Sequence, residues 1–387
     1  MEIADRISHL HYAIRDVILK AKEVEKTGKQ IYYLNIGDPN KYDFQPPEHI
    51  TNTIKNALDN PKFSGYAPSF GDEDLRQAVG RRENIDKENV FITNGLSEGI
   101  SFLFNALVNP GDNVLLPSPG YPLYNSISKV IGAEDNYYSC DKDWNPDTEV
   151  MRKKVNKKTK AIVVINPNNP TGAVYSRKAL EEIVNIAGEF DIPIIADEVY
   201  DKIVYDKEDK FISLADISKD VNVIRGYSIS KVYFYPGARI GYLALHGEGL
   251  NPLKTALQKL CNARLCINWE MQRGALAAFT NPGVYMKYNM EKLDKRRDLL
   301  YNTLKDVPEL DLVKPKGAFY AFAKINSGKW KDDWDFVYSL LEKTGVLVVP
   351  GSGFSPVLKE KYFRMVFLPQ ERIIQEATEK IRQFISE

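Results

Sequence analysis

A glycine-rich turn in the first third of the chain could either bind an anion or carry a nucleophile. It reads Gly95-Leu96-Ser97-Glu98-Gly99 and follows a short apolar run that predicts a strand. Glycine lets the backbone curl, so that N–H groups and a serine hydroxyl converge at a helix N-terminus, where the helix dipole favours negative charge. The turn contains no lysine and is therefore not a nucleotide-binding P-loop. A phosphate on a small cofactor fits it better.

The same turn also matches the G-x-S-x-G nucleophile elbow of α/β-hydrolases. A hydrolase would need an acid and a histidine after Ser97, and Asp197 could be the acid. Of the four histidines only His246 follows Ser97, and its neighbours give it no distinguishing chemistry. The hydrolase hypothesis also leaves the motifs below unexplained, so we favour anion binding.

The most informative segment spans residues 227–241 and reads YSISKVYFYPGARIG. Lys231 follows two serines and precedes an aromatic run, whereas a lone lysine after a strand is usually a solvated cation. Arg239 lies between two glycines, and its planar fork is well matched to phosphate oxygens. The segment resembles the lysine signature of fold-type I pyridoxal-phosphate enzymes, specifically the class I aminotransferases. The resemblance implies that Lys231 forms a Schiff base with pyridoxal 5'-phosphate. It also implies a set of phosphate ligands, namely Gly95, Leu96, Ser97, Ser228 and Arg239.

The resemblance implies further groups around the cofactor ring. Asp197 ends the apolar run Ile194–Ala196, where an unpaired carboxylate is costly, and it would keep the pyridine nitrogen protonated. Tyr200, three residues on, and Asn169, in the string N-P-N-N-P-T-G, would donate hydrogen bonds to the phenolic oxygen. Tyr121, in P-S-P-G-Y-P, would stack on the ring face.

Substrate and subunit contacts are implied in the same way. Arg364, in Y-F-R-M-V, is similar to the family's arginine for the substrate α-carboxylate, which Asn169 and the backbone of Gly37 would also approach. Tyr12, in the family-like string Y-x-I-R, is expected near the substrate. Tyr66 is similar to a tyrosine that reaches the phosphate from a neighbouring subunit, so the resemblance predicts a homodimer.

Several motifs look most like those of the alanine (glutamate–pyruvate) aminotransferases, which favours alanine and 2-oxoglutarate as substrates of a ping-pong reaction. Aspartate-specific relatives commonly carry a second arginine for the distal carboxylate, and Arg264 is the nearest candidate. Where the alanine enzymes continue the string Y-x-I-R with Gly-Pro, this chain has Asp16-Val17. Aspartate or aromatic aminotransferases and a pyridoxal-phosphate C–S lyase stay open as alternatives.

These residues must be positioned by the elements between them. Short β-branched runs alternate with amphipathic helices, which predicts an α/β fold with a mostly parallel sheet covered by helices on both faces. The predicted strands are Val90–Thr93, Asn113–Leu116, Ala161–Ile165, Pro193–Ala196, Val221–Gly226 and Ile240–Ala244. The predicted helices are Glu73–Arg82, Ser97–Leu107, Arg177–Phe190 and Pro252–Cys261.

After Asn281 the pattern changes to that of an α+β unit. Its predicted elements are the helices Tyr288–Val307 and Asp333–Thr344, the alternating segment Gly317–Lys324 and the strands Val346–Val349 and Tyr362–Val366. A helix over Ile14–Glu25 and a strand over Ile31–Ile36 are expected to pack on this unit. We therefore expect an N-terminal segment (1–45), a large cofactor-binding domain (46–282) and a small C-terminal domain (283–387), the arrangement of a fold-type I aminotransferase.

Composition excludes other classes of protein. Lys plus Arg and Asp plus Glu each number 52, so zero net charge gives no electrostatic argument for a nucleic-acid or membrane partner. No apolar run approaches the roughly 20 residues of a membrane helix, and the N-terminus has no signal-peptide core. The three cysteines have no metal-ligand spacing, so we expect no metal site and a reducing cytoplasm.

Overall fold

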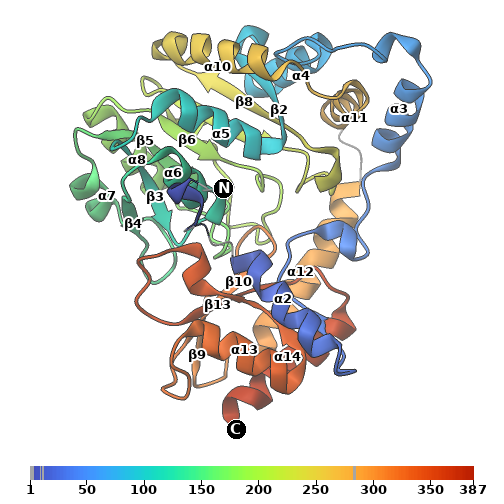
Figure 1. The fold of residues 1–387 in the computed structure, drawn as a ribbon, viewed down its shortest axis with the longest axis vertical. Coiled ribbons are helices and arrows are strands. Elements are labelled where there is room, and N and C mark those ends of the chain that lie inside the picture. The colour runs from blue at the N-terminus through green and yellow to red at the C-terminus, as the bar shows by residue number, and fades with distance from the viewer. Residues whose placement is uncertain (1–3, 9, 11–12, 282–284) are drawn as a thin grey trace.

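A computed structural model of the chain describes residues 4–8, 10, 13–281 and 285–387. Figure 1 shows a large sheet with its helices in the upper part of the molecule and a smaller sheet with its helices in the lower part. Helix α12 (Tyr285–Leu304) runs from the upper part into the lower one. Among the described residues, no helix combines the length and the apolar character needed to cross a membrane.

The large sheet has seven strands in the order β2-β8-β7-β6-β5-β3-β4. All neighbouring pairs are parallel except the two that involve β8, which runs antiparallel to β2 and to β7. The strands are β2 (Val90–Asn94), β3 (Asn113–Ser118), β4 (Tyr137–Ser139), β5 (Thr159–Ile165), β6 (Ile194–Asp197), β7 (Val223–Ser228) and β8 (Ile240–His246). The predicted mostly parallel sheet is confirmed. Because carboxyl ends of parallel strands share one edge, the loops after β3, β5, β6 and β7 meet there, where open α/β sheets bind ligands.

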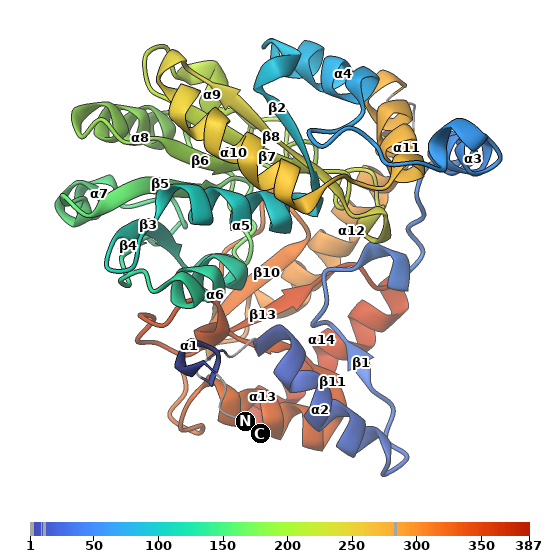
Figure 2. The ribbon, with the colours of Figure 1, turned by 45° about the horizontal axis from the view of Figure 1, so that its top comes forward.

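Strands β5 and β6 have core on both sides because successive side chains point to opposite faces. Val163 and Ile195 join the core that includes Ile100 of α5, whereas Ile162 and Ile194 join the core of α8. Figure 2 shows α5 and α10 on one side of this sheet and α8 and α9 on the other. The covering helices are α5 (Gly95–Leu107), α6 (Pro122–Ile131), α7 (Thr148–Lys154), α8 (Arg177–Glu189), α9 (Leu214–Ile217) and α10 (Asn251–Arg264).

The smaller sheet is antiparallel in the order β12-β13-β10-β9, and β1 pairs in parallel with β11 beside it. Its core strands place Phe322 of β10 directly opposite Arg364 of β13. The strands are β1 (Tyr32–Tyr33), β9 (Leu310–Leu312), β10 (Tyr320–Ile325), β11 (Val346–Leu347), β12 (Val349–Pro350) and β13 (Tyr362–Val366). The remaining helices are α1 (Asp5–Ser8), α2 (Ala13–Glu25), α3 (Glu48–Leu58), α4 (Glu73–Glu83), α11 (Trp269–Thr280), α13 (Asp333–Thr344) and α14 (Glu371–Ser386).

The structure corrects the predicted elements in three places. The single strand expected over Val346–Val349 is divided into β11 and β12, which pair with β1 and β13 respectively. The strand expected over Ile31–Ile36 is limited to the two residues of β1, because β11 offers only two partners. The sequence pattern did not predict α3, α6, α7, α11 or α14. Of these, α3 packs mainly on α11, and α11 also packs on α4 and on β8 of the large sheet, where its Phe279 ring meets Tyr242.

Candidate active site

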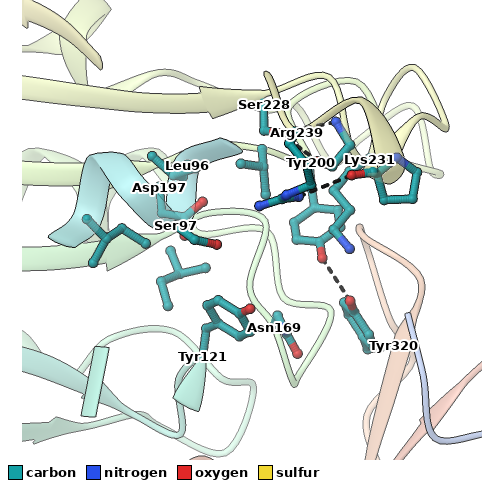
Figure 3. Close-up of a pocket in the computed structure, with 15 residues that line it drawn as sticks. Leu96, Ser97, Tyr121, Asn169, Asp197, Tyr200, Ser228, Lys231, Arg239 and Tyr320 are labelled. Carbon is teal, nitrogen blue, oxygen red and sulfur yellow. Dashed lines mark hydrogen bonds between the residues drawn. The ribbon is translucent and has the colours of Figure 1, made fainter. Parts of the chain in front are cut away.

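A cavity at the carboxyl edge of the large sheet has walls from both sheets. It is lined by the start of α5, by the loops that follow β3, β5, β6 and β7, and by the first residue of β10 (Figure 3). The lining residues are Leu96, Ser97, Ile100, Tyr121, Ile165, Asn169, Asp197, Val199, Tyr200, Ser228, Ser230, Lys231, Pro236, Arg239 and Tyr320. All predicted cofactor residues line this cavity except Gly95 and Tyr66. The fold therefore brings together residues spread over more than half of the chain.

Lys231 lies in the turn after β7 and points its amine into the cavity. The amine donates a hydrogen bond to the carbonyl oxygen of Gly37 at 2.9 Å and lies 5.5 Å from the centre of the Phe319 ring. Two residues close to this turn, Phe234 and Arg239, have left-handed backbones with φ of 48° and 53°. Such conformations cost free energy and gather at functional sites, where the surrounding structure enforces them.

The N-terminus of α5 lines the cavity, and its free N–H groups suit an anion. Asn94 precedes the helix without a capping side-chain hydrogen bond, which leaves backbone N–H groups of the first turn for a ligand. Gly95 lies directly behind Arg239, since a Cβ on Gly95 would fall 2.3 Å from the guanidinium Nη2. Its φ of +69° also favours glycine. The hydroxyls of Ser228 and Ser230 lie 2.7 Å apart on the β7 side of the same cavity.

Asp197 ends β6, lines the same cavity and is buried. One carboxylate oxygen accepts a hydrogen bond from the Tyr124 hydroxyl at 3.0 Å. The other, Oδ1, has no hydrogen-bond partner among the described residues. Burial raises the pKa of Asp197 to about 6, and the Tyr124 hydroxyl, the backbone N–H of Val199 and the charge of Lys231 offset part of this effect. A buried carboxylate oxygen without a partner is costly, so a cationic donor is the group that this position accommodates best.

A chain of contacts joins the two sheets across the cavity. Arg364, which is buried, donates to the Asn169 side-chain oxygen at 3.1 Å and to the backbone carbonyl of Asn35. The hydroxyl of Tyr200 lies 2.8 Å from that of Tyr320, and Figure 3 shows this hydrogen bond at the cavity wall. Burial raises the pKa of Tyr200 well above its ordinary value, so the hydroxyl keeps its proton at neutral pH.

The remaining predicted residues have different placements. Tyr121 precedes α6 and lines the cavity. Gly37 touches the site through its carbonyl oxygen, as described for Lys231. Tyr66 does not line the cavity, and 83% of it is exposed. Tyr12 lies outside the described residues.

The hydrolase hypothesis is wrong, because Ser97 and His246 belong to opposite ends of the sheet. In the β2–β8 pair, Asn94 is opposite Ile240 at the cavity edge. His246 is six residues further along β8, and its Nε2 lies 3.7 Å from a carboxylate oxygen of Glu83. Among the residues that the structure describes, no histidine lines the cavity that contains Ser97.

Arg264 also lies outside the cavity lining. Its guanidinium donates to a carboxylate oxygen of Glu98 at 2.9 Å and to the carbonyl of Ser69 at 2.7 Å. These contacts join the last residue of α10 to Glu98 of α5 and to the loop before α4.

Sequence reasoning missed two tyrosines of the site. Tyr124, one turn into α6, reaches Asp197 from a neighbouring helix. Tyr320 reaches Tyr200 from the other sheet. The only local signal for Tyr320 is its place in an alternating segment, G-A-F-Y-A-F, which is typical of a strand.

The fold and this cavity define a class of enzyme, and the chain belongs to it. Residues 32–381 match the family described as aminotransferase class I and II. The chain is therefore an aminotransferase, an enzyme that transfers nitrogenous groups, and pyridoxal phosphate is the cofactor of this family.

Particular relatives match over the full length. Glutamate-pyruvate aminotransferase AlaA of Haemophilus influenzae is 36% identical, covering 99% of this chain and 98% of its own. Alanine aminotransferase of Mycobacterium tuberculosis is 35% identical, covering 98% of this chain and 91% of its own. Among solved structures, alanine aminotransferase from Pyrococcus furiosus superposes with a TM-score of 0.96 at 42% identity, with 100% of both chains covered.

The residues of the cavity fit pyridoxal phosphate at both of its ends. The uncapped N-terminus of α5 together with Arg239 suits a phosphate. The unpartnered oxygen of Asp197 suits a protonated ring nitrogen. Lys231, which lines the same cavity, supplies an amine of the kind that can form a covalent link to a carbonyl.

Proposed function

We propose that this enzyme exchanges the amino group of L-alanine with 2-oxoglutarate by a ping-pong reaction, with Lys231 as its catalytic residue. The observation that carries the proposal is the joining in one cavity of the Lys231 amine, the buried Asp197 carboxylate and the anion-binding start of α5. The choice of alanine rests on the relatives, which are named glutamate-pyruvate and alanine aminotransferases.

Bound pyridoxal phosphate supplies an electron sink for the pair left when the substrate loses its Cα proton. Lys231 would move this proton: its Nζ, which lies in the cavity, would accept the proton from Cα and return it. Asp197 would keep the ring nitrogen protonated. Gly95, Leu96, Ser97, Ser228 and Arg239 would hold the phosphate.

Asn169 and Tyr200 would donate hydrogen bonds to the phenolic oxygen of the cofactor. The side-chain oxygen of Asn169 accepts from Arg364, which leaves its amide nitrogen as the free donor. Tyr200 keeps its proton because of burial, as described above. Tyr121 would stack on the ring face.

Arg364 is the proposed ligand of the substrate carboxylate, because its planar fork can bind both carboxylate oxygens. The backbone of Gly37 and the side chain of Asn169 would border the same carboxylate, and Tyr12 is proposed to lie close to the substrate. Arg264 is engaged by Glu98, which disfavours the use of this arginine for a distal carboxylate within one subunit.

We further propose that the enzyme is a cytoplasmic homodimer in which Tyr66 completes the neighbouring subunit's phosphate site. The high exposure of Tyr66 in the single chain supports a contact with a second copy. The described cysteines are all free, as expected in a reducing compartment. Mixing a Lys231→Ala chain with a Tyr66→Phe chain tests the shared site, because a hybrid dimer would contain one site with both native residues. Activity that does not rise on mixing would contradict the proposal.

Half-reactions with single amino acids test the proposed substrate. We expect L-alanine to bleach the cofactor band of the purified enzyme and to yield pyruvate without free ammonia, and 2-oxoglutarate to restore the band. L-Aspartate and L-tyrosine should react more slowly. Faster bleaching by either would overturn the choice of alanine, and release of ammonia in proportion to pyruvate would indicate a lyase.

A further inference from the structure

Tyr320 lines the cavity and contacts both a proposed cofactor ligand, Tyr200, and the proposed substrate ligand, Arg364. None of the roles assigned above belongs to Tyr320 itself. It is the first residue of β10 in the smaller sheet and is buried. Its hydroxyl lies 2.8 Å from the hydroxyl of Tyr200, which follows β6 of the large sheet. The two rings meet edge to face, with centroids 5.8 Å apart. Tyr320 is thus a direct hydrogen-bonded link between the sheets at the cavity wall.

The ring of Tyr320 also lies against the guanidinium of Arg364. The distance from the guanidinium carbon to the ring centre is 4.6 Å, and Phe354 lies at 4.7 Å. The register explains this contact: Phe322 is directly opposite Arg364, so Tyr320 is its diagonal neighbour on the same face. A desolvated cation over an aromatic ring is held firmly in place.

The hydroxyl of Tyr320 packs closely against the backbone of Gly37. A Cβ on Gly37 would fall 2.3 Å from that hydroxyl oxygen, so only glycine leaves room for it. The carbonyl of the same glycine accepts a hydrogen bond from Lys231. Tyr320 therefore contacts Arg364, Gly37 and Tyr200. Arg364 is the proposed substrate ligand, Gly37 accepts from Lys231, and Tyr200 is the proposed donor to the phenolic oxygen.

We propose that Tyr320 is a positioning residue whose hydroxyl donates to Tyr200 and whose ring holds Arg364, so that one side chain aligns the cofactor-facing and the substrate-facing groups. The proposal rests on the proposed role of Tyr200 toward the cofactor. If Tyr200 donates its proton to the phenolic oxygen, its own oxygen must accept from Tyr320. Hydrogen bonds in such a chain strengthen one another by roughly 10–30%.

The experiment is a pH titration of the holoenzyme, read from the absorbance bands that report the protonation of the link between Lys231 and the cofactor. Losing a donor to the phenolic oxygen leaves more negative charge there, and the link then holds its proton more tightly. Tyr200→Phe should raise the pKa of the link by about one to two units. Tyr320→Phe should raise it in the same direction by about a few tenths of a unit.

The second readout separates the ring from the hydroxyl. Tyr320→Phe keeps the ring on Arg364, so the KM for L-alanine should stay within about twofold of the native value. Tyr320→Leu removes the ring as well and should raise that KM about tenfold. Tyr205→Phe is a matched control, because it removes a tyrosine hydroxyl that bonds the carbonyl of Ala318, two residues from Tyr320, outside the cavity lining.

The outcomes distinguish this proposal from the function on which it rests. A pKa that rises in Tyr200→Phe but equals the native value in Tyr320→Phe would overturn the role of Tyr320 and leave the proposed function intact. An equal rise in Tyr205→Phe would also overturn it, since any lost hydroxyl would then suffice. A native protein without a cofactor band would instead refute the proposed function.

Discussion

Replacing Asp197 by asparagine should stabilise the protein without cofactor while weakening cofactor binding. Burial raises the pKa of this carboxyl from 3.8 to about 6. The folded state therefore binds more protons than the unfolded chain between these two values, and the free energy of unfolding falls as the pH rises through that window. A shift of about two units corresponds to about 3 kcal/mol at pH 7 or above. Asparagine fits the same space, cannot ionise and can still accept from the Tyr124 hydroxyl.

The assay is urea unfolding of the native and Asp197→Asn proteins, both stripped of cofactor, between pH 4 and pH 8. We expect equal stability near pH 4 and a gain for the variant that grows to about 3 kcal/mol by pH 8. Titration with pyridoxal phosphate should show the reverse order, with affinity about 10- to 100-fold weaker in the variant, because a charge-assisted hydrogen bond to the ring nitrogen is lost.

Asp201→Asn is the matched control, since Asp201 is also buried but accepts from the guanidinium groups of Arg82 and Arg225. Removing one partner from such a buried cluster should destabilise the protein by about 3 kcal/mol. An Asp197→Asn protein that is less stable than the native protein at pH 8 would refute the reasoning, because it would mean that the Asp197 carboxylate is well paired before the cofactor binds.

Two further substitutions probe the ends of the cavity. Gly95→Ala would place a methyl group 2.3 Å from the Arg239 guanidinium and strain a backbone with φ of +69°. We therefore expect cofactor affinity, measured by fluorescence titration, to fall at least about tenfold. Unchanged affinity would contradict the proposed position of the phosphate. Arg364→Lys keeps the positive charge but loses the planar guanidinium. The KM for L-alanine should therefore rise about 10- to 100-fold, while the absorbance spectrum of the bound cofactor stays unchanged. An unchanged KM would exclude Arg364 as the ligand of the substrate carboxylate.

Residues within continuous motifs could be placed from the sequence because local backbone geometry determines their position. Arg239 lies between two glycines and has a left-handed backbone, and its spacing from Lys231 is set by the short turn between β7 and β8. Asp197 could be placed at the sheet edge because a polar residue ends an apolar run there. Parallel strands then bring such positions to one edge without further information.

Contacts that depend on packing between elements could not be predicted. Tyr320 reaches Tyr200 only because β10 pairs with β13 in a particular register and the smaller sheet packs on the cavity. Tyr124 reaches Asp197 across the gap between a helix and a strand. The turn at Ser97 matches both an anion-binding turn and a nucleophile elbow, and the motif alone cannot separate them. The pairing of β2 with β8 does, because it places His246 at the far end of the sheet.

The central claim is that Lys231 carries pyridoxal phosphate in the cavity between the two sheets. Borohydride reduction of the holoenzyme makes the link permanent, and peptide mass mapping then locates it. We predict that the reduced cofactor is found on the peptide containing Lys231, and that it is absent from that peptide if L-alanine is added before reduction. Cofactor attached to another lysine, or none attached at all, would contradict the account.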